Sequence, residues 1–152
     1  MNTIEIRKGE IIQRSGELNS KIYNVNTGLL RSYTIDDKGK EHIYQFAPEK
    51  WMIADLGSPE KPCQLFIDAI EDSSVTVFEK DPDISPTDKI KLTNRMKVLQ
   101  NRIIMLISAS ALDRYLHFIE TYPNIIERVP QRMIASYLGV TPEALSRVRK
   151  NL

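Results

Sequence analysis

The stretch QRMIASYLGVTPEALSRVRKNL, residues 131–152, contains two short apolar repeats separated by a glycine. Gly139 can adopt the left-handed conformation that commonly ends a helix. Thr141 then offers a hydroxyl N-cap, and Pro142 stands at the first helical position, where its missing N–H costs nothing. This punctuation predicts two helices joined by one tight turn, which is a helix-turn-helix.

The second predicted helix has two different faces. Its apolar face is formed by residues at helical spacing, Leu145, Val148 and Leu152. Its polar face carries Glu143, Arg147 and Lys150 at spacings of four and three residues. An ordinary helical hairpin with a solvated Glu143–Arg147 ion pair would also show a polar face. The joint occurrence of the turn, the cap and the apolar set favours DNA binding instead.

Positive charge is concentrated in the same part of the chain, although the formal net charge is only +1. The only acidic residue from position 128 onward is Glu143. The basic residues there are Arg128, Arg132, Arg147, Arg149 and Lys150. A basic cluster on a helix-turn-helix is the electrostatic pattern of a nucleic-acid-binding segment.

The composition is that of a globular chain, with 41% hydrophobic and 27% charged residues among 152. No apolar run approaches the roughly 20 residues of a membrane span, and the amino terminus has no signal-peptide core. We therefore expect a cytoplasmic protein with no membrane partner. The single cysteine, Cys63, excludes an intrachain disulfide and a four-cysteine metal site within one chain.

The first half of the chain consists of short β-rich runs separated by turn residues. The runs are residues 4–6, 11–13, 22–26, 29–35, 42–46, 51–53, 65–70 and 75–78. Glycine-containing turns such as Thr27-Gly28 and Asp36-Asp37-Lys38-Gly39 separate several of them. This pattern is typical of an all-β sandwich or jelly roll, closed by Pro82 and Pro86.

Beyond Thr87 the apolar period becomes helical. Five residues recur at alternating four- and three-residue steps and form a heptad seam: Leu92, Met96, Leu99, Ile103 and Leu106. Such a seam packs either on the chain's own sheet or on a second copy. We favour a homodimer, because the flanking basic residues, among them Arg102, have the pattern of a solvated face. Ser108-Ala109-Ser110 is expected to form a hinge before a docking helix that carries Leu112, Tyr115, Leu116 and Ile119.

In this order, the elements resemble the cyclic-AMP receptor and fumarate–nitrate regulator (Crp/Fnr) family of bacterial transcription factors. The resemblance rests on residues 7–12, 15–17, 26–31, 37–41 and 129–152. It implies an α+β fold with a jelly-roll sensor domain of cyclic-nucleotide-binding type over residues 1–86. A dimerisation helix and hinge over residues 87–110 and a helix-turn-helix DNA-binding domain over residues 111–152 would follow. This last domain is winged-helix-like, but the sequence ends without a β-hairpin wing.

The resemblance also implies a function. Two copies would bind a palindromic operator in double-stranded DNA, with RNA polymerase as a candidate further partner. It places the base-contacting glutamate and arginine of the family at Glu143 and Arg147, which suit a cytosine amino group and the guanine O6/N7 edge. The full set of expected DNA contacts is Thr141, Glu143, Ser146, Arg147, Lys150 and Arg132.

The chain departs from the family at the ligand pocket. The expected pocket residues are Trp51, Ala54, Asp55, Leu56, Gln64, Leu99 and Gln100. In the family, a Gly-Glu pair holds the ribose and an Arg-Ser pair holds the cyclic phosphate, but at the corresponding positions this chain has residues 54–57, Ala-Asp-Leu-Gly, and Cys63-Gln64. The Asp55 carboxylate could accept a hydrogen bond from a ribose hydroxyl, but without a nearby cation it would repel a phosphate. We therefore expect no cyclic-AMP cofactor, no metal, and an effector whose identity is unknown.

Nothing in the sequence supports catalysis, since it has no Ser/His/Asp arrangement, phosphate-cradling glycine loop or paired carboxylates. A homodimeric DNA-binding regulator is the leading hypothesis. The alternative is a small-molecule sensor or dimeric interaction module with weak or no DNA binding.

Overall fold

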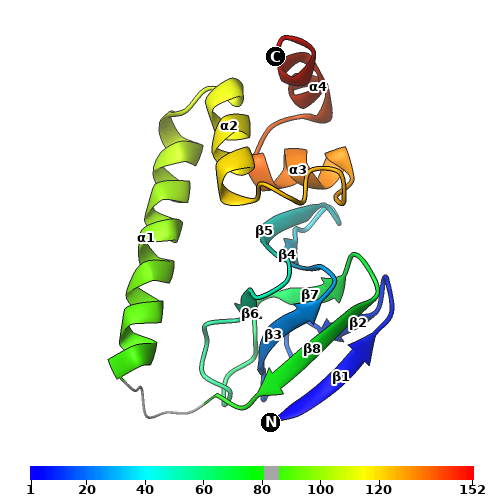
Figure 1. Ribbon diagram of the computed structural model, residues 1–152, viewed down its shortest axis with the longest axis vertical. Helices are drawn as coiled ribbons and strands as arrows, with labels where there is room; N and C mark the ends of the chain where they lie inside the picture. The colour runs from blue at the N-terminus through cyan, green and yellow to red at the C-terminus, as the bar shows by residue number, and fades with distance from the viewer. Residues whose placement is uncertain (81–85) are drawn as a thin grey trace. The chain divides into compact units, whose positions relative to one another are not determined.

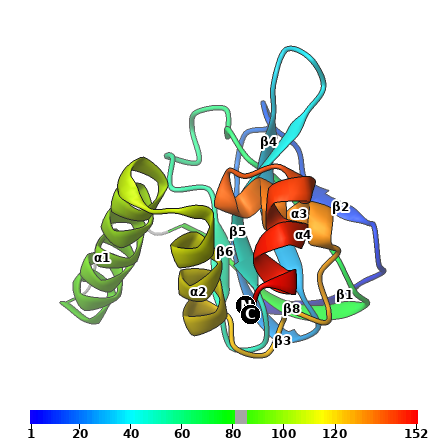
Figure 2. The ribbon, with the colours of Figure 1, turned by 90° about the horizontal axis from the view of Figure 1, so that it is seen from above.

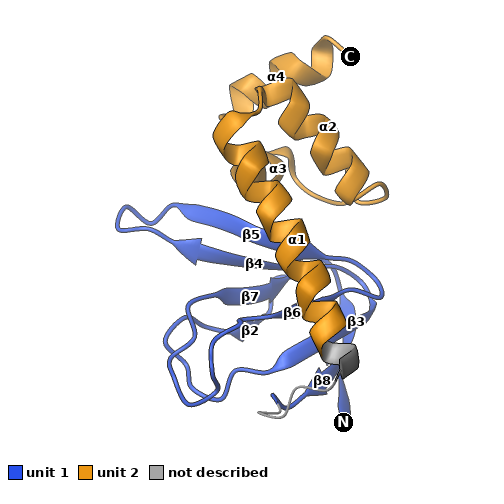
Figure 3. Cartoon of the chain, turned by 90° about the vertical axis from the view of Figure 1, so that its left-hand side faces the viewer, with its two compact units in different colours: residues 1–80 blue, residues 81–152 orange. Residues whose placement is uncertain are grey.

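The computed structural model describes residues 1–80 and 86–152, which contain eight strands followed by four helices (Figure 1). The expected α+β class is confirmed. The chain divides into two compact units, residues 1–80 and 81–152 (Figure 3). Pro82, expected to help close the sandwich, lies outside the described residues. The three predicted functional segments, with boundaries after residues 86 and 110, remain a prediction.

The first unit is a sandwich of two antiparallel sheets. Its strands are β1 (Asn2–Ile6), β2 (Ile11–Gln13), β3 (Ile22–Thr27), β4 (Leu30–Ile35), β5 (Glu41–Ala47), β6 (Met52–Ala54), β7 (Phe66–Ala69) and β8 (Ser73–Phe78). One sheet has the order β1-β8-β3-β6 and the other β2-β7-β4-β5. All eight predicted runs are strands, with ends that differ by at most two residues.

The core of the sandwich lies between the two sheets. Val25, Leu30, Ile67 and Val75 are fully buried there, and each belongs to a different strand. Their strand neighbours point to the opposite face, as the two-residue period of a strand requires. Trp51, one of the predicted pocket residues, precedes β6 and packs, half-buried, against this core.

Two turns fix the register of the central strands. Gly28, between β3 and β4, has φ 96°, and a Cβ there would lie 2.2 Å from the Ser73 hydroxyl oxygen, so only glycine fits this close approach. The β4–β5 hairpin extends well beyond the rest of its sheet (Figure 2). In its turn, Asp36 Oδ1 accepts hydrogen bonds from the backbone amides of Lys38 and Lys40.

The second unit contains the helices α1 (Pro86–Ser108), α2 (Ala111–Thr121), α3 (Gln131–Leu138) and α4 (Pro142–Lys150). The predicted break between the first two helices is confirmed. Ser110 is the N-cap of α2, and its hydroxyl accepts a hydrogen bond from the Asp113 amide.

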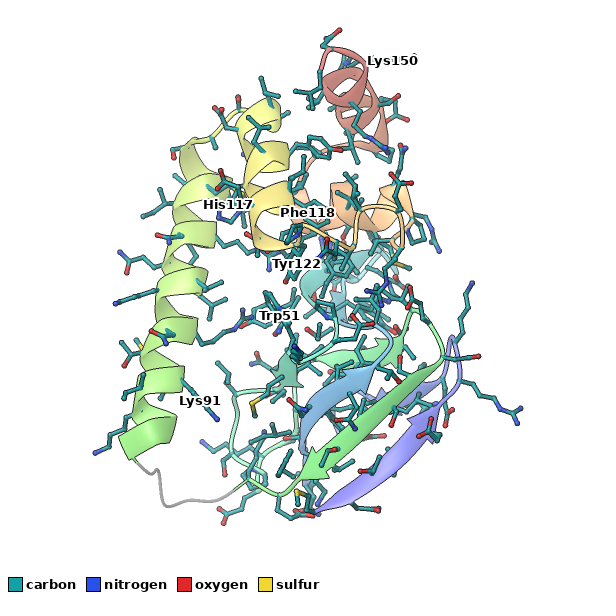
Figure 4. The ribbon with its side chains drawn as sticks, viewed as in Figure 1. Trp51, Lys91, His117, Phe118, Tyr122 and Lys150 are labelled. Atoms are coloured by element: carbon teal, nitrogen blue, oxygen red, sulfur yellow. The ribbon has the colours of Figure 1, made fainter. Side chains whose placement is uncertain are left out.

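The core of the second unit is aromatic. Phe118 of α2, Tyr122 at its C-cap and Tyr137 of α3 lie with ring centroids 5.5–5.7 Å apart. Figure 4 labels the first two of these residues. The expected docking face of α2 is therefore partly wrong, because Leu112 and Leu116 are exposed whereas Phe118 is buried. The phase of the helix places Tyr115 and Phe118 inward, three residues apart.

Candidate nucleic-acid interface

The helix-turn-helix predicted from residues 131–152 is present. Gly139 ends α3 with φ 66° and ψ 32°, the left-handed conformation expected there. Its amide donates to the carbonyl of Ser136, and the Val140 amide donates to the carbonyl of Ala135. These two bonds close the C-terminus of α3 and turn the chain into α4.

The start of α4 also follows the prediction. The Thr141 hydroxyl accepts a hydrogen bond of 3.1 Å from the Ala144 amide, and Pro142 begins the helix. Leu145 is buried and anchors the helix. The prediction that Leu152 joins this anchor is wrong, because α4 ends at Lys150 and Leu152 is 66% exposed.

The polar face of α4 is open to solvent. Glu143, Arg147 and Lys150 are all exposed, and Lys150 extends from the last turn of α4 (Figure 4). Within residues 1–80 and 86–152, none of the three side chains has a hydrogen bond or an ion pair. The Glu143–Arg147 surface ion pair considered above is therefore not formed. These side chains keep their hydrogen-bonding capacity for a ligand.

The other predicted DNA contacts differ in their surroundings. Arg132 is exposed in the first turn of α3, and Ser146 is half-buried on α4. Thr141 is exposed, but its hydroxyl already accepts the capping bond. The side chain thus has a local structural role at the helix start.

Sequence reasoning missed Arg114, a half-buried residue of α2. Its guanidinium donates four hydrogen bonds to backbone carbonyls: Leu106, Ala109, Leu138 and Gly139, at 2.8–3.3 Å. These carbonyls belong to the end of α1, the break that follows it, and the end of α3. Arginine has five donors in a rigid fork, which suits such a junction. The neighbouring residues in the sequence gave no indication of this role, because all four acceptors are backbone carbonyls.

The expectation that Arg102 is solvated is wrong. Its guanidinium carbon lies 3.9 Å from the centroid of the Tyr137 ring, and Nη2 donates 3.0 Å to the Tyr137 carbonyl. Arg102 does lie beside the apolar seam of α1, but at this point α1 is next to α3, so the side chain packs on Tyr137 rather than in solvent.

Comparisons with known proteins agree with this geometry. No protein-family model matches the chain. It is 27% identical over 168 residues to the fumarate and nitrate reduction regulatory protein of Escherichia coli K12, and 28% identical over 163 residues to electron transport regulator A of Shewanella oneidensis. Each match covers 94% of this chain, but the chain spans only 65% of each relative.

Solved structures have the same architecture. FixK2 from Bradyrhizobium japonicum matches with a TM-score of 0.85 at 23% identity, over 99% of this chain and 83% of FixK2. A transcriptional regulator of the Crp/Fnr family from Thermus thermophilus matches with a TM-score of 0.80 at 17% identity, over 99% of this chain and 85% of its own. The fold is that of the Crp/Fnr regulators. The resemblance inferred from the sequence is therefore confirmed, and the relatives are named as regulators rather than enzymes.

The predicted Crp/Fnr dimerisation seam lies on an apolar face of α1. Leu92, Met96 and Ile103 are exposed, the last to 56%, whereas Leu99 and Leu106 are half-buried. Ile107 extends this face and is 78% exposed. Met105, on the opposite side of the helix, is buried. The helix thus has one packed side and one uncovered apolar side.

Asp55, one of the predicted pocket residues, already accepts hydrogen bonds from its own loop. The side chain is only 5% exposed. Its carboxylate accepts hydrogen bonds from three backbone amides, those of Gly57, Gln64 and Leu65, at 2.7–3.0 Å. Burial alone would raise the pKa of Asp55, but these amide bonds outweigh it and hold the pKa below its usual value. Asp55 therefore holds two loop segments together.

The expectation that no cation lies near Asp55 is also wrong. Lys80 interacts electrostatically with Asp55, and its ammonium donates 2.6 Å to the Ser20 hydroxyl and 2.7 Å to the Gly57 carbonyl. Burial lowers the pKa of Lys80, and the charge of Asp55 partly offsets that effect. Asp55 and Lys80 are 25 residues apart in the sequence, so no local pattern indicated that they interact.

The remaining predicted pocket residues differ in exposure and belong to both units, so their grouping into one pocket stays a prediction. Ala54 is half-buried, whereas Leu56 and Gln64 are exposed. Leu99 and Gln100 belong to α1 and thus to the second unit. A separate hollow of about 460 Å³ in the sandwich is lined mainly by residues of β1, β2, β3 and β8, Tyr23 among them.

The described residues contain neither a metal-binding cluster nor a membrane-spanning helix. No group of three or more histidine, cysteine, aspartate or glutamate side chains there is arranged to hold a metal ion. No helix in the same residues combines the length and apolarity needed to cross a bilayer.

Proposed function

We propose that this chain forms a homodimeric, sequence-specific DNA-binding transcription regulator of Crp/Fnr type that acts in the cytoplasm. The observation that carries the proposal is the polar face of α4. Glu143, Arg147 and Lys150 are exposed without partners in the described part of the chain, on a helix anchored by Leu145 and begun by Thr141. A helix of this kind fits the major groove of B-DNA.

Each exposed side chain has a proposed contact. Arg147 donates two parallel hydrogen bonds to guanine O6 and N7, and Glu143 accepts from a cytosine amino group. Lys150 and Arg132 contact phosphates, which fixes the position of the helix without selecting sequence. Thr141 and Ser146 lie near the DNA at the start and middle of α4.

The dimer is proposed from the uncovered face of α1. A seam of Leu92, Met96, Leu99, Ile103 and Leu106 would bury its exposed atoms against the same seam of a second copy. The two α4 helices would then contact adjacent major grooves about one helical turn apart on a palindromic operator. RNA polymerase and a small-molecule effector complete the proposed partners.

The dimer proposal is tested by Ile103→Glu. A carboxylate in a desolvated seam lacks a partner, so the variant should be monomeric. Sedimentation velocity measures the change, and Lys91→Glu, which alters an exposed residue of the same helix, is the matched control. An unchanged dimer in the Ile103→Glu protein would show that the seam is not the main interface.

The DNA proposal is tested by selecting bound fragments from random duplexes. We expect enrichment of a palindrome with two half-sites about one helical turn apart. Failure of the wild-type protein to enrich any palindrome would favour the alternative of a small-molecule sensor or dimeric interaction module.

A further inference from the structure

We infer that Arg102 and Arg114 are positioning residues that fix the helix-turn-helix on the end of α1. They are called the arginine clamp below. The inference rests on the proposed function, because it concerns how α4 is presented to DNA. Neither side chain belongs to the polar face of α4.

The backbone carbonyls at the end of α3 identify the clamp. The last four carbonyls of any α-helix have no partner within the helix. In α3, those of Ala135 and Ser136 accept from the amides of the turn. The remaining two, Tyr137 and Leu138, accept from the guanidinium groups of Arg102 and Arg114.

The cations that complete this helix end come from other helices. The last turn of α3 contains no basic residue, although cations there are favoured by the helix dipole. Arg102 reaches it from α1 and Arg114 reaches it from α2. A guanidinium also stacks on Tyr137, which adds a directional contact. The end of α3 is therefore defined by residues outside the helix-turn-helix.

The other bonds of Arg114 tie the same point to α1. Nη2 donates 2.8 Å to the Leu106 carbonyl, which is one of the unpaired carbonyls at the end of α1, and Nε donates 3.1 Å to Ala109. One planar group thus joins the end of α1, the break and the end of α3. A Cβ on Gly139 would lie 3.4 Å from Nη1, so the turn into α4 and this guanidinium are close-packed.

This connection has a consequence for a dimer. Since α1 carries the proposed seam and α4 follows α3 after one short turn, the clamp fixes the distance between the two α4 helices. Simultaneous binding to two half-sites requires that this distance match the spacing of the half-sites. Binding to a single half-site has no such requirement. The clamp should therefore determine spacing, and leave base preference to α4.

The clamp itself is tested without DNA. Arg114→Met keeps the apolar stem and removes the donors, so the amides of residues 138–145 should exchange hydrogen faster with solvent. Arg114→Lys should give an intermediate rate, because an ammonium cannot reach all four carbonyls in a planar fork. Lys91→Met, an exposed charge on the same unit, is the control. Unchanged exchange in Arg114→Met would overturn the clamp, whatever the protein does with DNA.

The positioning role is tested on the operator selected by the wild-type protein. We expect Arg114→Met to weaken binding to the palindrome by about 10- to 100-fold and to a single half-site by less than about threefold. The variant should also tolerate palindromes with one base pair inserted or removed at the centre. Equal losses on palindrome and half-site would assign Arg114 a merely structural role. Absence of any operator for the wild-type protein would overturn the proposed function, but would leave the exchange result intact.

Discussion

Asp55 in the sandwich and Arg147 on α4 were both predicted to contact a ligand, yet their surroundings are opposite. Asp55 is buried, and three backbone amides already donate to its carboxylate. Arg147 is exposed, and no hydrogen bond to its side chain occurs within the described ranges. A charged group contacts a ligand only if it has unused hydrogen-bonding capacity. Asp55 is therefore a structural carboxylate, whereas the Arg147 side chain remains available for the DNA contact proposed above.

The same contrast extends to arginines. In the sandwich, Arg31 donates to both oxygens of Asp68 at 2.8 and 2.9 Å, and to Glu41 at 2.6 Å. Burial alone would lower the pKa of Arg31, but the two carboxylates raise it overall. In the helical unit, the arginine clamp binds carbonyls and Arg147 binds nothing in the described structure. Arginine side chains of this chain thus occur in three settings: paired with buried carboxylates, bonded to backbone carbonyls, and exposed without a partner in the described residues.

The largest expected effect comes from breaking the buried pair. Arg31→Met leaves Asp68 buried without its cation, so we expect the free energy of unfolding of the sandwich to fall by about 3–5 kcal/mol. Urea denaturation followed by fluorescence measures this, because the only tryptophan, Trp51, packs on the sandwich core. The control is Lys21→Met, which removes the partner of exposed Glu79 and should cost less than about 1 kcal/mol. Similar losses of unfolding free energy in both variants would show that the buried Arg31–Asp68 pair is no stronger than the exposed Lys21–Glu79 pair.

A smaller effect is expected at Asp55. Asp55→Asn replaces an acceptor oxygen by an NH₂ group that faces backbone donors, at an expected cost of about 1–3 kcal/mol in unfolding free energy. Because the folded-state pKa is lowered, the carboxylate stabilises the sandwich above its ordinary pKa, which lies near 3.8. That stabilisation is lost as pH falls through the folded value. The difference between variant and wild type should therefore shrink below about pH 4. A difference that is constant down to pH 2 would contradict this assignment.

The sequence predicted elements well where one local pattern was sufficient. The turn at Gly139 and the cap at Thr141 depend on residues at most five positions apart, and both are present. Contacts between distant segments had no such pattern. Arg114 bonds carbonyls of residues 8 and 24 positions away, and the backbone amides that bind Asp55 include one 10 positions away. Backbone partners leave no trace in side-chain identity, so these roles could not be predicted.

Arg147→Ala tests the exposed side of the comparison. We expect specific DNA affinity to fall by about 1–3 kcal/mol and selectivity to relax at one base pair. The free energy of unfolding should stay within about 0.5 kcal/mol of wild type, because the side chain is exposed and unpartnered in the described structure. Binding titrations on matched and mutated operators measure the first effect. Lys150→Ala is the control: it should weaken all sequences alike and reduce the salt slope by about one.

The smallest expected effect is no effect at all, and it concerns cyclic nucleotides. A buried cyclic phosphate requires a cation with free donors, because transferring the charged phosphate out of water without such a partner is costly. The ammonium of Lys80, near Asp55, already donates to Ser20 and Gly57. Arg31, elsewhere in the sandwich, already donates to two carboxylates. Since a ligand of the folded state raises stability by RT ln(1 + [L]/Kd), cyclic AMP or cyclic GMP at millimolar concentration should leave the melting temperature unchanged. A saturable rise in melting temperature with a micromolar midpoint would show that Lys80 or Arg31 can exchange its present hydrogen bonds for bonds to the ligand. Hydrogen-bonding capacity in the free protein would then not decide which residues bind.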